Sequence, residues 1–129
     1  MIRFRRGAWR AMIEHAERAY PEECCGALIG SINGEAHLAA RALPLENAAA
    51  NRRVRYSIRP GDLGEADAAA SAAGLELVGI YHSHPDREPS FSPEDAAGAW
   101  PRLSFVVLSI RNGRFEAARS FRAAPPDAR

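Results

Sequence analysis

The sequence predicts a single-domain α/β protein of the α+β type, with a mixed β-sheet of about six strands sandwiched by about three helices. The length of 129 residues suits one domain with a core of its own. The 47% of hydrophobic and 26% of charged residues are ordinary for a globular protein. Short apolar runs that end at glycine, proline or asparagine alternate with helical patterns, and these give the order of elements.

Two helices and a short third one are predicted. Apolar residues at helical spacing mark the first, namely Trp9, Met12, Ile13, Ala16 and Tyr20. This helix ends at Pro21. Pro60 suits the first turn of the second helix, where its missing N–H is harmless, and Gly74 suits the C-terminal cap. The short third helix begins at Ser92.

The predicted strands are apolar or alternating runs bounded by turn residues. They cover residues 25–32, 36–43, 54–58, 75–81, 104–110 and 114–121. The run 75–81 is almost continuously apolar, as expected of a central strand. Asn112-Gly113 is a strong hairpin signal between the last two strands. The domain is predicted to span residues 1–122, and the tail 123–129, rich in alanine and proline, is predicted to be disordered.

Charge and hydropathy argue against several classes of partner. The net charge of +1 gives no electrostatic basis for binding nucleic acid, and the arginine-rich start, residues 3–10, is expected to be a solvated face. No apolar run approaches the roughly 20 residues that span a bilayer, and the N-terminus lacks a signal-peptide pattern. Cys24 and Cys25 are adjacent, too close for an ordinary disulfide. We therefore expect a cytoplasmic protein without nucleic-acid or membrane partners.

His82, His84 and Asp95 are candidate metal ligands. His82 and His84 lie two residues apart at the end of the central strand, so both project from one face, while Ser83 points to the other. Pro85 ends the regular pairing, and the chain is long enough to return with Asp95 as a third ligand. Two imidazoles and a carboxylate leave one position of a tetrahedral zinc open, which is typical of a catalytic site.

Each part of this pattern also has a simpler explanation. A His-x-His pair alone is weak support for a metal site. Ser92 and Asp95 also fit the N-cap and third position of a helix, and that role competes for the Asp95 side chain. His15 and His37 have no partner at ligand spacing, so we expect both at the surface.

A zinc hydrolase also needs a base that takes a proton from the attacking water. Glu22 and Glu23 lie just before the first strand, and spacing alone does not choose between them or exclude that both are solvated charges. Cys24 and Cys25 are expected to be buried core residues, since free cysteine is among the most buried types. A redox sensor or an extra metal ligand is the alternative for them.

The combined pattern resembles the JAMM/MPN+ (JAB1/MPN/Mov34-type) zinc metalloproteases, in particular their small prokaryotic members. The family pattern is an upstream Glu, then His-[Ser/Thr]-His-Pro, with Ser and Asp eight and eleven residues after the second His. The sequence supplies it as His82, Ser83, His84, Pro85, Ser92 and Asp95. The family Glu is followed by two residues and a Gly, which favours Glu23, three residues before Gly26. The resemblance covers residues 6–122 and implies the JAB/MPN (cytidine-deaminase-like) fold.

The resemblance also implies an activity and a role for each residue. It implies one Zn²⁺ per chain, held by His82, His84 and Asp95. Glu23 is the implied general base, which passes the proton to the leaving amine, and Ser92 the implied donor to the oxyanion. The implied reaction is hydrolysis of a peptide or isopeptide bond after the C-terminal Gly-Gly of a ubiquitin-like or sulfur-carrier protein.

Two other functions stay open from the sequence. One is a non-catalytic interaction scaffold with the MPN fold, which bound metal would distinguish from an enzyme. The other is a DNA-associated protein resembling the RadC group, which shares His-x-His-Pro and a downstream Ser-x-x-Asp. The near-zero net charge argues against it.

Overall fold

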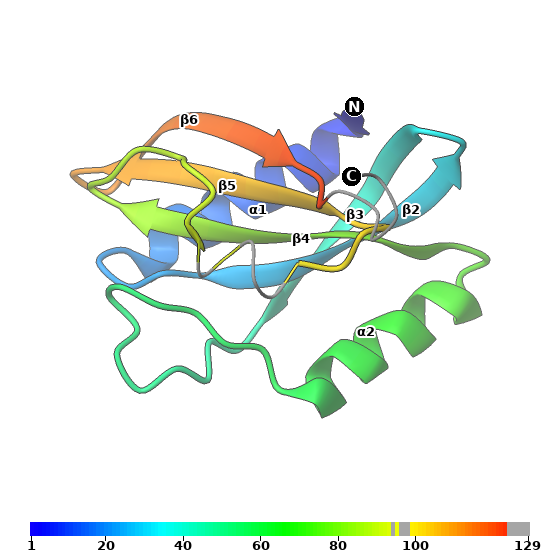
Figure 1. Ribbon diagram of the computed structural model, residues 1–129, viewed down its shortest axis with the longest axis horizontal. Coiled ribbons are helices and arrows are strands. Elements are labelled where there is room, and N and C mark those ends of the chain that lie inside the picture. The colour runs from blue at the N-terminus through cyan, green and yellow to red at the C-terminus, as the bar shows by residue number, and fades with distance from the viewer. Residues whose placement is uncertain (94, 96–98, 124–129) are drawn as a thin grey trace.

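The computed structural model describes residues 1–93, 95 and 99–123. One six-stranded sheet carries a helix on each face (Figure 1). The elements are β1 (Ile2–Phe4), α1 (Arg6–Ala19), β2 (Cys25–Asn33), β3 (Ala36–Leu45), α2 (Pro60–Ala72), β4 (Glu76–Pro85), β5 (Ser104–Arg111) and β6 (Arg114–Phe121). The strand order is β1-β3-β2-β4-β5-β6, with β1–β3 and β4–β5 parallel and the other pairs antiparallel. This mixed sheet confirms the predicted fold class.

Two apolar layers hold the helices on the sheet. On the α1 face, Met12 and Ala16 are fully buried against Leu28, Tyr81 and Leu108 from the central strands. On the other face, a second layer contains Ile80, Leu103 and Phe105. Strand β4 supplies both layers because successive side chains point to opposite faces. The same alternation therefore determines the sheet face to which each side chain near the C-terminal end of β4 points.

Turn geometry confirms the signals in the sequence. Asn112 and Gly113 have φ angles of 51° and 82°, as a two-residue turn with both central residues left-handed requires, and they join β5 to β6. Pro60 occupies the first turn of α2, and Gly74 follows that helix with a φ of 73°. The helix from Trp9 and the hairpin of the first two predicted strands are confirmed as α1 and β2–β3.

The prediction of a strand at residues 54–58 is wrong. Val54 lies in a turn and residues 55–58 do not join the sheet, because their backbone bonds to the segment around Asn47 instead of to a neighbouring strand. Their alternation holds only in part: Tyr56 and Ile58 pack toward the second layer and Ser57 between them is exposed, but Val54, which shares their spacing, is exposed as well. The sixth strand is instead β1, a three-residue strand that pairs with residues 37–39 of β3.

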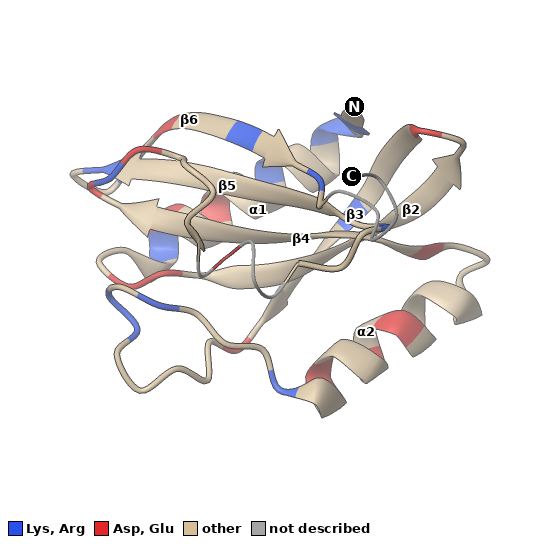
Figure 2. Cartoon of the chain, in the orientation of Figure 1, with Lys and Arg blue, Asp and Glu red and all other residues tan. Residues whose placement is uncertain are grey.

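The surface and the chain ends bear on the remaining expectations. Figure 2 shows charges of both signs interspersed along the chain, in keeping with the net charge of +1. The helix predicted from Ser92 falls partly on residues 94 and 96–98, outside the described residues, as does all of the predicted tail except residue 123. Two helices, α1 and α2, lie within the described residues, where about three were predicted overall. No helix in that part of the chain has the length and hydropathy needed to cross a membrane.

The expectation that His15 and His37 lie at the surface is wrong for His37 and holds only in part for His15. His37 is only 4% exposed, and its Nδ1 lies 2.7 Å from the Ser104 hydroxyl. His15 is half-buried, with its Nδ1 2.7 Å from the Tyr81 hydroxyl. Each imidazole is accommodated because a polar partner replaces the hydrogen bond to water that burial removes.

Candidate metal centre

The end of β4 places His82 and His84 side by side on the face away from α1. Both are buried, at 0% and 4% exposure, and their Nε2 atoms are 3.2 Å apart. Ser83 faces the opposite side, as predicted, where its hydroxyl accepts a hydrogen bond from the Cys24 N–H at 2.8 Å. The Ser83 N–H also donates to the Cys24 carbonyl. Strand β4 therefore fixes both the histidine pair and the segment that leads into β2.

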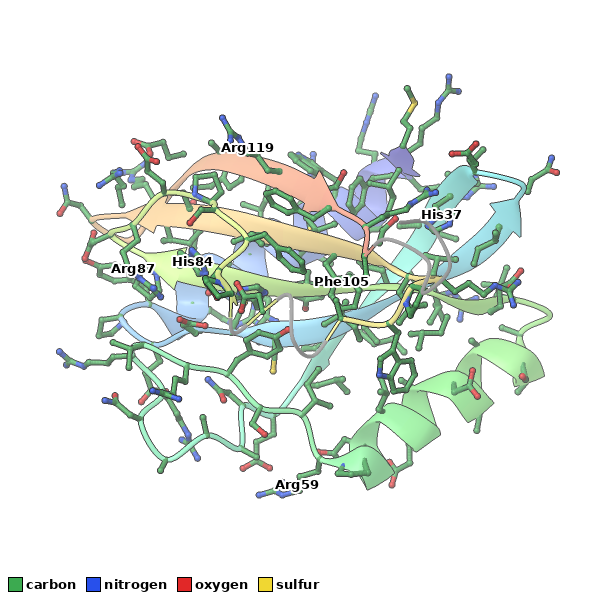
Figure 3. All side chains as sticks on the ribbon, viewed as in Figure 1. His37, Arg59, His84, Arg87, Phe105 and Arg119 are labelled. Atoms are coloured by element: carbon green, nitrogen blue, oxygen red, sulfur yellow. The ribbon has the colours of Figure 1, made fainter. Side chains whose placement is uncertain are left out.

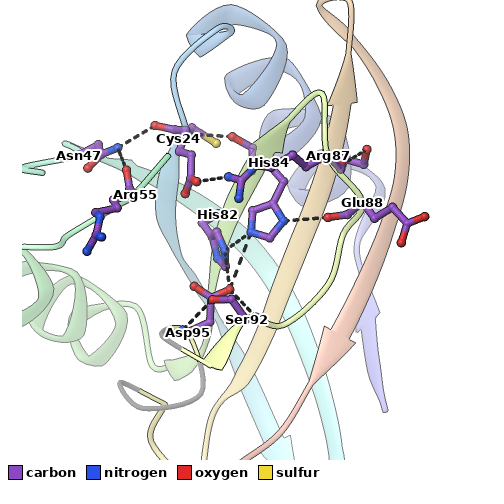
Figure 4. Close-up of polar contacts among 12 residues, drawn as sticks. Cys24, Asn47, Arg55, His82, His84, Arg87, Glu88, Ser92 and Asp95 are labelled. Carbon is purple, nitrogen blue, oxygen red and sulfur yellow. Dashed lines mark hydrogen bonds and ion pairs between the residues drawn. The ribbon is translucent and has the colours of Figure 1, made fainter. Parts of the chain in front are cut away.

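Asp95 completes the group. Its Oδ2 lies 3.3 Å from Nε2 of His82 and 3.8 Å from Nε2 of His84, and the three side chains form a cluster that could hold a metal ion (Figure 4). The Nδ1 of His84 lies 2.8 Å from the Glu88 carbonyl, which can only accept, so this nitrogen carries the proton. The Nε2 of His84 is then a lone-pair donor directed at the cluster, as in a metal-binding histidine.

The electrostatics of the three groups fit a cation. Burial lowers the pKa of His82 and keeps its ring neutral, against the opposing effect of Asp95. Burial alone would raise the pKa of Asp95, but hydrogen bonds with His82 and His84 outweigh it and hold that pKa well below its ordinary value. Among the described residues, Nδ1 of His82 is the one buried side-chain N or O atom without a hydrogen-bond partner. The neutral ring of His82 and the ionised carboxylate of Asp95 thus converge with the imidazole of His84, and two imidazoles with a carboxylate are a donor set that suits Zn²⁺.

Asp95 is placed to serve both as a helix cap and as a metal ligand, the two roles that are alternatives from the sequence alone. The Asp95 N–H donates to Oγ of Ser92 at 3.0 Å, and the Ser92 N–H donates to Oδ2 of Asp95 at 3.1 Å. This reciprocal pair is the arrangement of a helix-start capping box. The same carboxylate also faces the histidines, so the cap orients Asp95 toward the cluster.

Glu23 and Glu22, which the sequence alone could not distinguish, have opposite environments. Glu22 is exposed, whereas Glu23 is 3% exposed and lines the same pocket as His84 and Asp95. Burial raises the pKa of Glu23 to about 7, although the nearby His84 and Arg87 oppose the rise. Its Oε2 accepts a hydrogen bond from Nη2 of Arg87 at 2.5 Å. A carboxyl group with a pKa near neutrality is suited to proton transfer.

The backbone of Glu23 is held by the segment that follows β3. Its N–H donates to the Arg52 carbonyl at 2.6 Å, and its carbonyl accepts from Nδ2 of Asn47 at 3.0 Å. Asn47 also donates to the Arg55 carbonyl and accepts from the N–H groups of Ala49 and Ser57. This buried amide is therefore fully bonded, and it ties Glu23 to the segment that carries Tyr56. No signal in the single sequence distinguishes Asn47 from an ordinary loop residue.

Replacing Asn47 with alanine is expected to lower the free energy of unfolding by about 1–3 kcal/mol, because several buried backbone groups lose their partners. Urea denaturation would measure this loss as a lower midpoint with an unchanged slope. The matched control is Asn51→Ala, since Asn51 is exposed and its hydrogen bonds with other described residues involve only its backbone carbonyl. Equal stability of the Asn47 variant and the control would show that the hydrogen bonds of the Asn47 side chain do not stabilise the fold.

A cavity of about 630 Å³ opens beside the cluster. Its polar wall contains Glu23, His84, Arg87, Ser92 and Asp95, and its apolar wall contains Val54, Tyr56, Ile58, Leu63, Trp100 and Phe105. Figure 3 shows His84 and Arg87 close together near the end of β4, with Phe105 farther along the same sheet face. The ring of Tyr56 stacks on His82, with centroids 4.2 Å apart and planes at 20°. The cavity thus joins the cluster, Glu23 and an apolar surface.

Cys24 and Cys25 are buried free thiols, as expected. Burial raises the pKa of Cys24 to about 11 and that of Cys25 to about 12. The thiolate is the form that reacts and binds metal, so these values disfavour both a redox sensor and an extra ligand.

Comparisons with known proteins give a consistent family. A family model described as prokaryotic homologs of the JAB domain matches residues 5–124. The desampylase of Haloferax volcanii is 37% identical over 90 residues, which are 69% of this chain and 63% of that protein. The chain therefore spans less than two-thirds of the length of that relative. The CysO-cysteine peptidase of Mycobacterium tuberculosis is 32% identical over 113 residues, which are 87% of this chain and 75% of the peptidase.

Solved structures support the same fold. The solution structure of a protein from Desulfitobacterium hafniense has a TM-score of 0.81 and 27% identity, and the match covers 96% of this chain and 85% of that one. A JAB1/MPN domain protein from Archaeoglobus fulgidus has a TM-score of 0.56 and 18% identity, over 95% of this chain and 89% of that one. The predicted JAB/MPN fold is therefore confirmed.

Proposed function

The chain belongs to the family of prokaryotic homologs of the JAB domain, and on that premise we propose that it is a zinc-dependent peptidase. We propose that it hydrolyses a peptide or isopeptide bond after the C-terminal Gly-Gly of a ubiquitin-like or sulfur-carrier protein. The observation that carries this proposal is the convergence of His82, His84 and Asp95, together with the place of the buried Glu23 beside His84 and Asp95 on the wall of one cavity.

Each site residue has a proposed task. His82, His84 and Asp95 hold one Zn²⁺, which when bound supplies Lewis-acid chemistry that polarises a carbonyl and makes water more acidic. Glu23 takes a proton from the attacking water and returns it to the leaving amine. Oε2 of Glu23 contacts Arg87, and Oε1 accepts no hydrogen bond from the described residues, so Oε1 is the oxygen available to the water.

Ser92 is the proposed donor to the oxyanion. Its Oγ accepts a hydrogen bond from the Asp95 N–H, which fixes the hydroxyl oxygen and leaves the hydroxyl proton to be donated elsewhere. Ser92 lines the same cavity as Glu23, so one substrate can meet both groups. A donor fixed before reaction stabilises charge that develops only in the transition state.

Two observations support the proposed substrate class. The relatives are a desampylase and a CysO-cysteine peptidase, and the match to the peptidase covers most of this chain. The apolar wall around Tyr56 and Trp100 offers a surface for an extended tail, and glycine lets a backbone approach the metal ligands closely. The buried free thiols of Cys24 and Cys25 support a reducing, cytoplasmic setting.

The proposal is tested by mass spectrometry of a fusion in which a β-grasp sulfur-carrier domain ends in Gly-Gly followed by a short extension. We expect a cut after the second glycine that stops when a chelator is added. An intact fusion in the presence of the zinc-loaded protein would contradict the proposal.

A further inference from the structure

We propose that Arg87 binds the free α-carboxylate of the leaving residue, so that the protein releases a single C-terminal amino acid from its carrier. This inference rests on the proposed function and narrows its substrate class to linear conjugates that end one residue after the Gly-Gly.

Arg87 is placed beside the reacting groups and has unused hydrogen-bonding capacity. Its guanidinium lines the same cavity as Glu23, His84 and Asp95, and its side chain is 44% exposed. Only Nη2 makes a hydrogen bond to a described residue, the bond to Glu23. A guanidinium has five N–H donors in a planar fork that matches a carboxylate, so the rest of the group can bind a second anion.

The backbone that carries Arg87 is fixed on both sides. The Ser109 hydroxyl donates to the Arg87 carbonyl at 2.6 Å, and the Asp86 N–H donates to the Ile110 carbonyl at 2.7 Å. On the other side, the Glu88 carbonyl accepts the hydrogen bond from His84. The segment is therefore tied to β5 and to a proposed metal ligand, which presents Arg87 from a rigid support.

The chemistry of the leaving group connects Arg87 to a free amino acid. In hydrolysis the C–N bond breaks, the carbonyl carbon gains the water oxygen, and the nitrogen gains a proton from Glu23. The new amine therefore lies against the Glu23 carboxylate, which Arg87 also contacts. In an α-amino acid, one carbon separates the amine from the carboxylate. A base and a guanidinium in contact thus match the two charged groups of one released amino acid.

An isopeptide substrate lacks this match. Its leaving nitrogen is the end of a lysine side chain, and the α-carboxyl of that lysine lies far along the side chain and within a peptide bond. Arg87 would then face the leaving group without an anion to bind. The alternative role for Arg87 is that of an inhibitory latch, whose charge neutralises Glu23 and slows the cleavage of every substrate. In that case, replacing Arg87 would speed up the cleavage of all substrates.

The test compares three substrates built on the same β-grasp carrier domain ending in Gly-Gly. The first continues with one alanine that has a free carboxylate, the second has that alanine as its C-terminal amide, and the third is joined to a lysine side chain with blocked ends. We expect the wild-type protein to prefer the acid over the amide by about tenfold in kcat/KM, as one partly exposed charge-assisted contact would give. Arg87→Ala should reduce that ratio to about one, and Arg87→Lys should restore part of it.

The acid-to-amide ratio is the decisive reading because both substrates share any effect of Arg87 on Glu23. Arg102→Ala is the matched control, since Arg102 is exposed and pairs with Glu76 at the opposite end of β4. An unchanged ratio in Arg87→Ala would overturn the inference while leaving the proposed function in place. Faster cleavage of all substrates by that variant would overturn it in favour of the latch. Cleavage of none by the wild type would remove the proposed function and the inference together.

Discussion

Replacing Glu23 with glutamine is expected to lower kcat by about 10²–10⁴-fold, the usual contribution of a general base, while zinc stays bound. Glutamine keeps the shape of the side chain and an oxygen for the hydrogen bond from Arg87, but it cannot take a proton from water. Steady-state cleavage of the carrier fusion, with metal content measured on the same sample, gives both quantities.

Glu22→Gln is the matched control for this experiment. Glu22 is the neighbouring carboxylate and lies exposed, so its replacement should leave kcat within about twofold of wild type. Full activity of the Glu23 variant would remove the general-base role, and a loss of zinc in that variant would show that Glu23 holds the centre together.

Replacing Asp95 with alanine is expected to weaken zinc binding by at least about 100-fold. Loss of an outer partner of a metal ligand already costs about 10–100-fold, and this change removes a proposed ligand with its negative charge. Competition with a chromophoric chelator measures the affinity. Asp67→Ala, at an exposed position of α2, should bind zinc like the wild type.

A second variant separates the two roles of Asp95. Asparagine at this position keeps an oxygen for the Ser92 N–H but is a poorer ligand than a carboxylate, so Asp95→Asn should keep its folding stability and still lose zinc affinity. Full zinc occupancy in Asp95→Ala would leave Asp95 as a helix cap alone.

The metal cluster could be predicted because its geometry is mostly local. His82 and His84 share a face through the two-residue period of β4, and Asp95 returns over a short loop. Glu23 differs, because it joins the cluster only through the tertiary fold. The family pattern favours Glu23 over Glu22, and the burial of Glu23 and the exposure of Glu22 give a physical reason for that preference.

The errors of sequence interpretation have a common physical origin. Residues 54–58 alternate as a strand does, but whether an extended segment joins a sheet depends on its hydrogen-bond partners, and here Asn47 supplies them. β1 has three residues, too few for a periodic signal. Arg87 lies 64 positions from Glu23 along the chain, so only the folded structure brings them together. The burial of His37 has the same origin, since its partner Ser104 is distant in sequence.

A zinc titration of the metal-free protein, with turnover of the Gly-Gly carrier fusion followed at each step, tests the proposed peptidase most directly. Cleavage should rise in proportion to added zinc and level off at about one ion per chain, as a single tetrahedral site with three protein ligands requires. Cleavage that is already complete without metal, or saturated zinc without any cleavage, would contradict a zinc-dependent peptidase built on His82, His84 and Asp95.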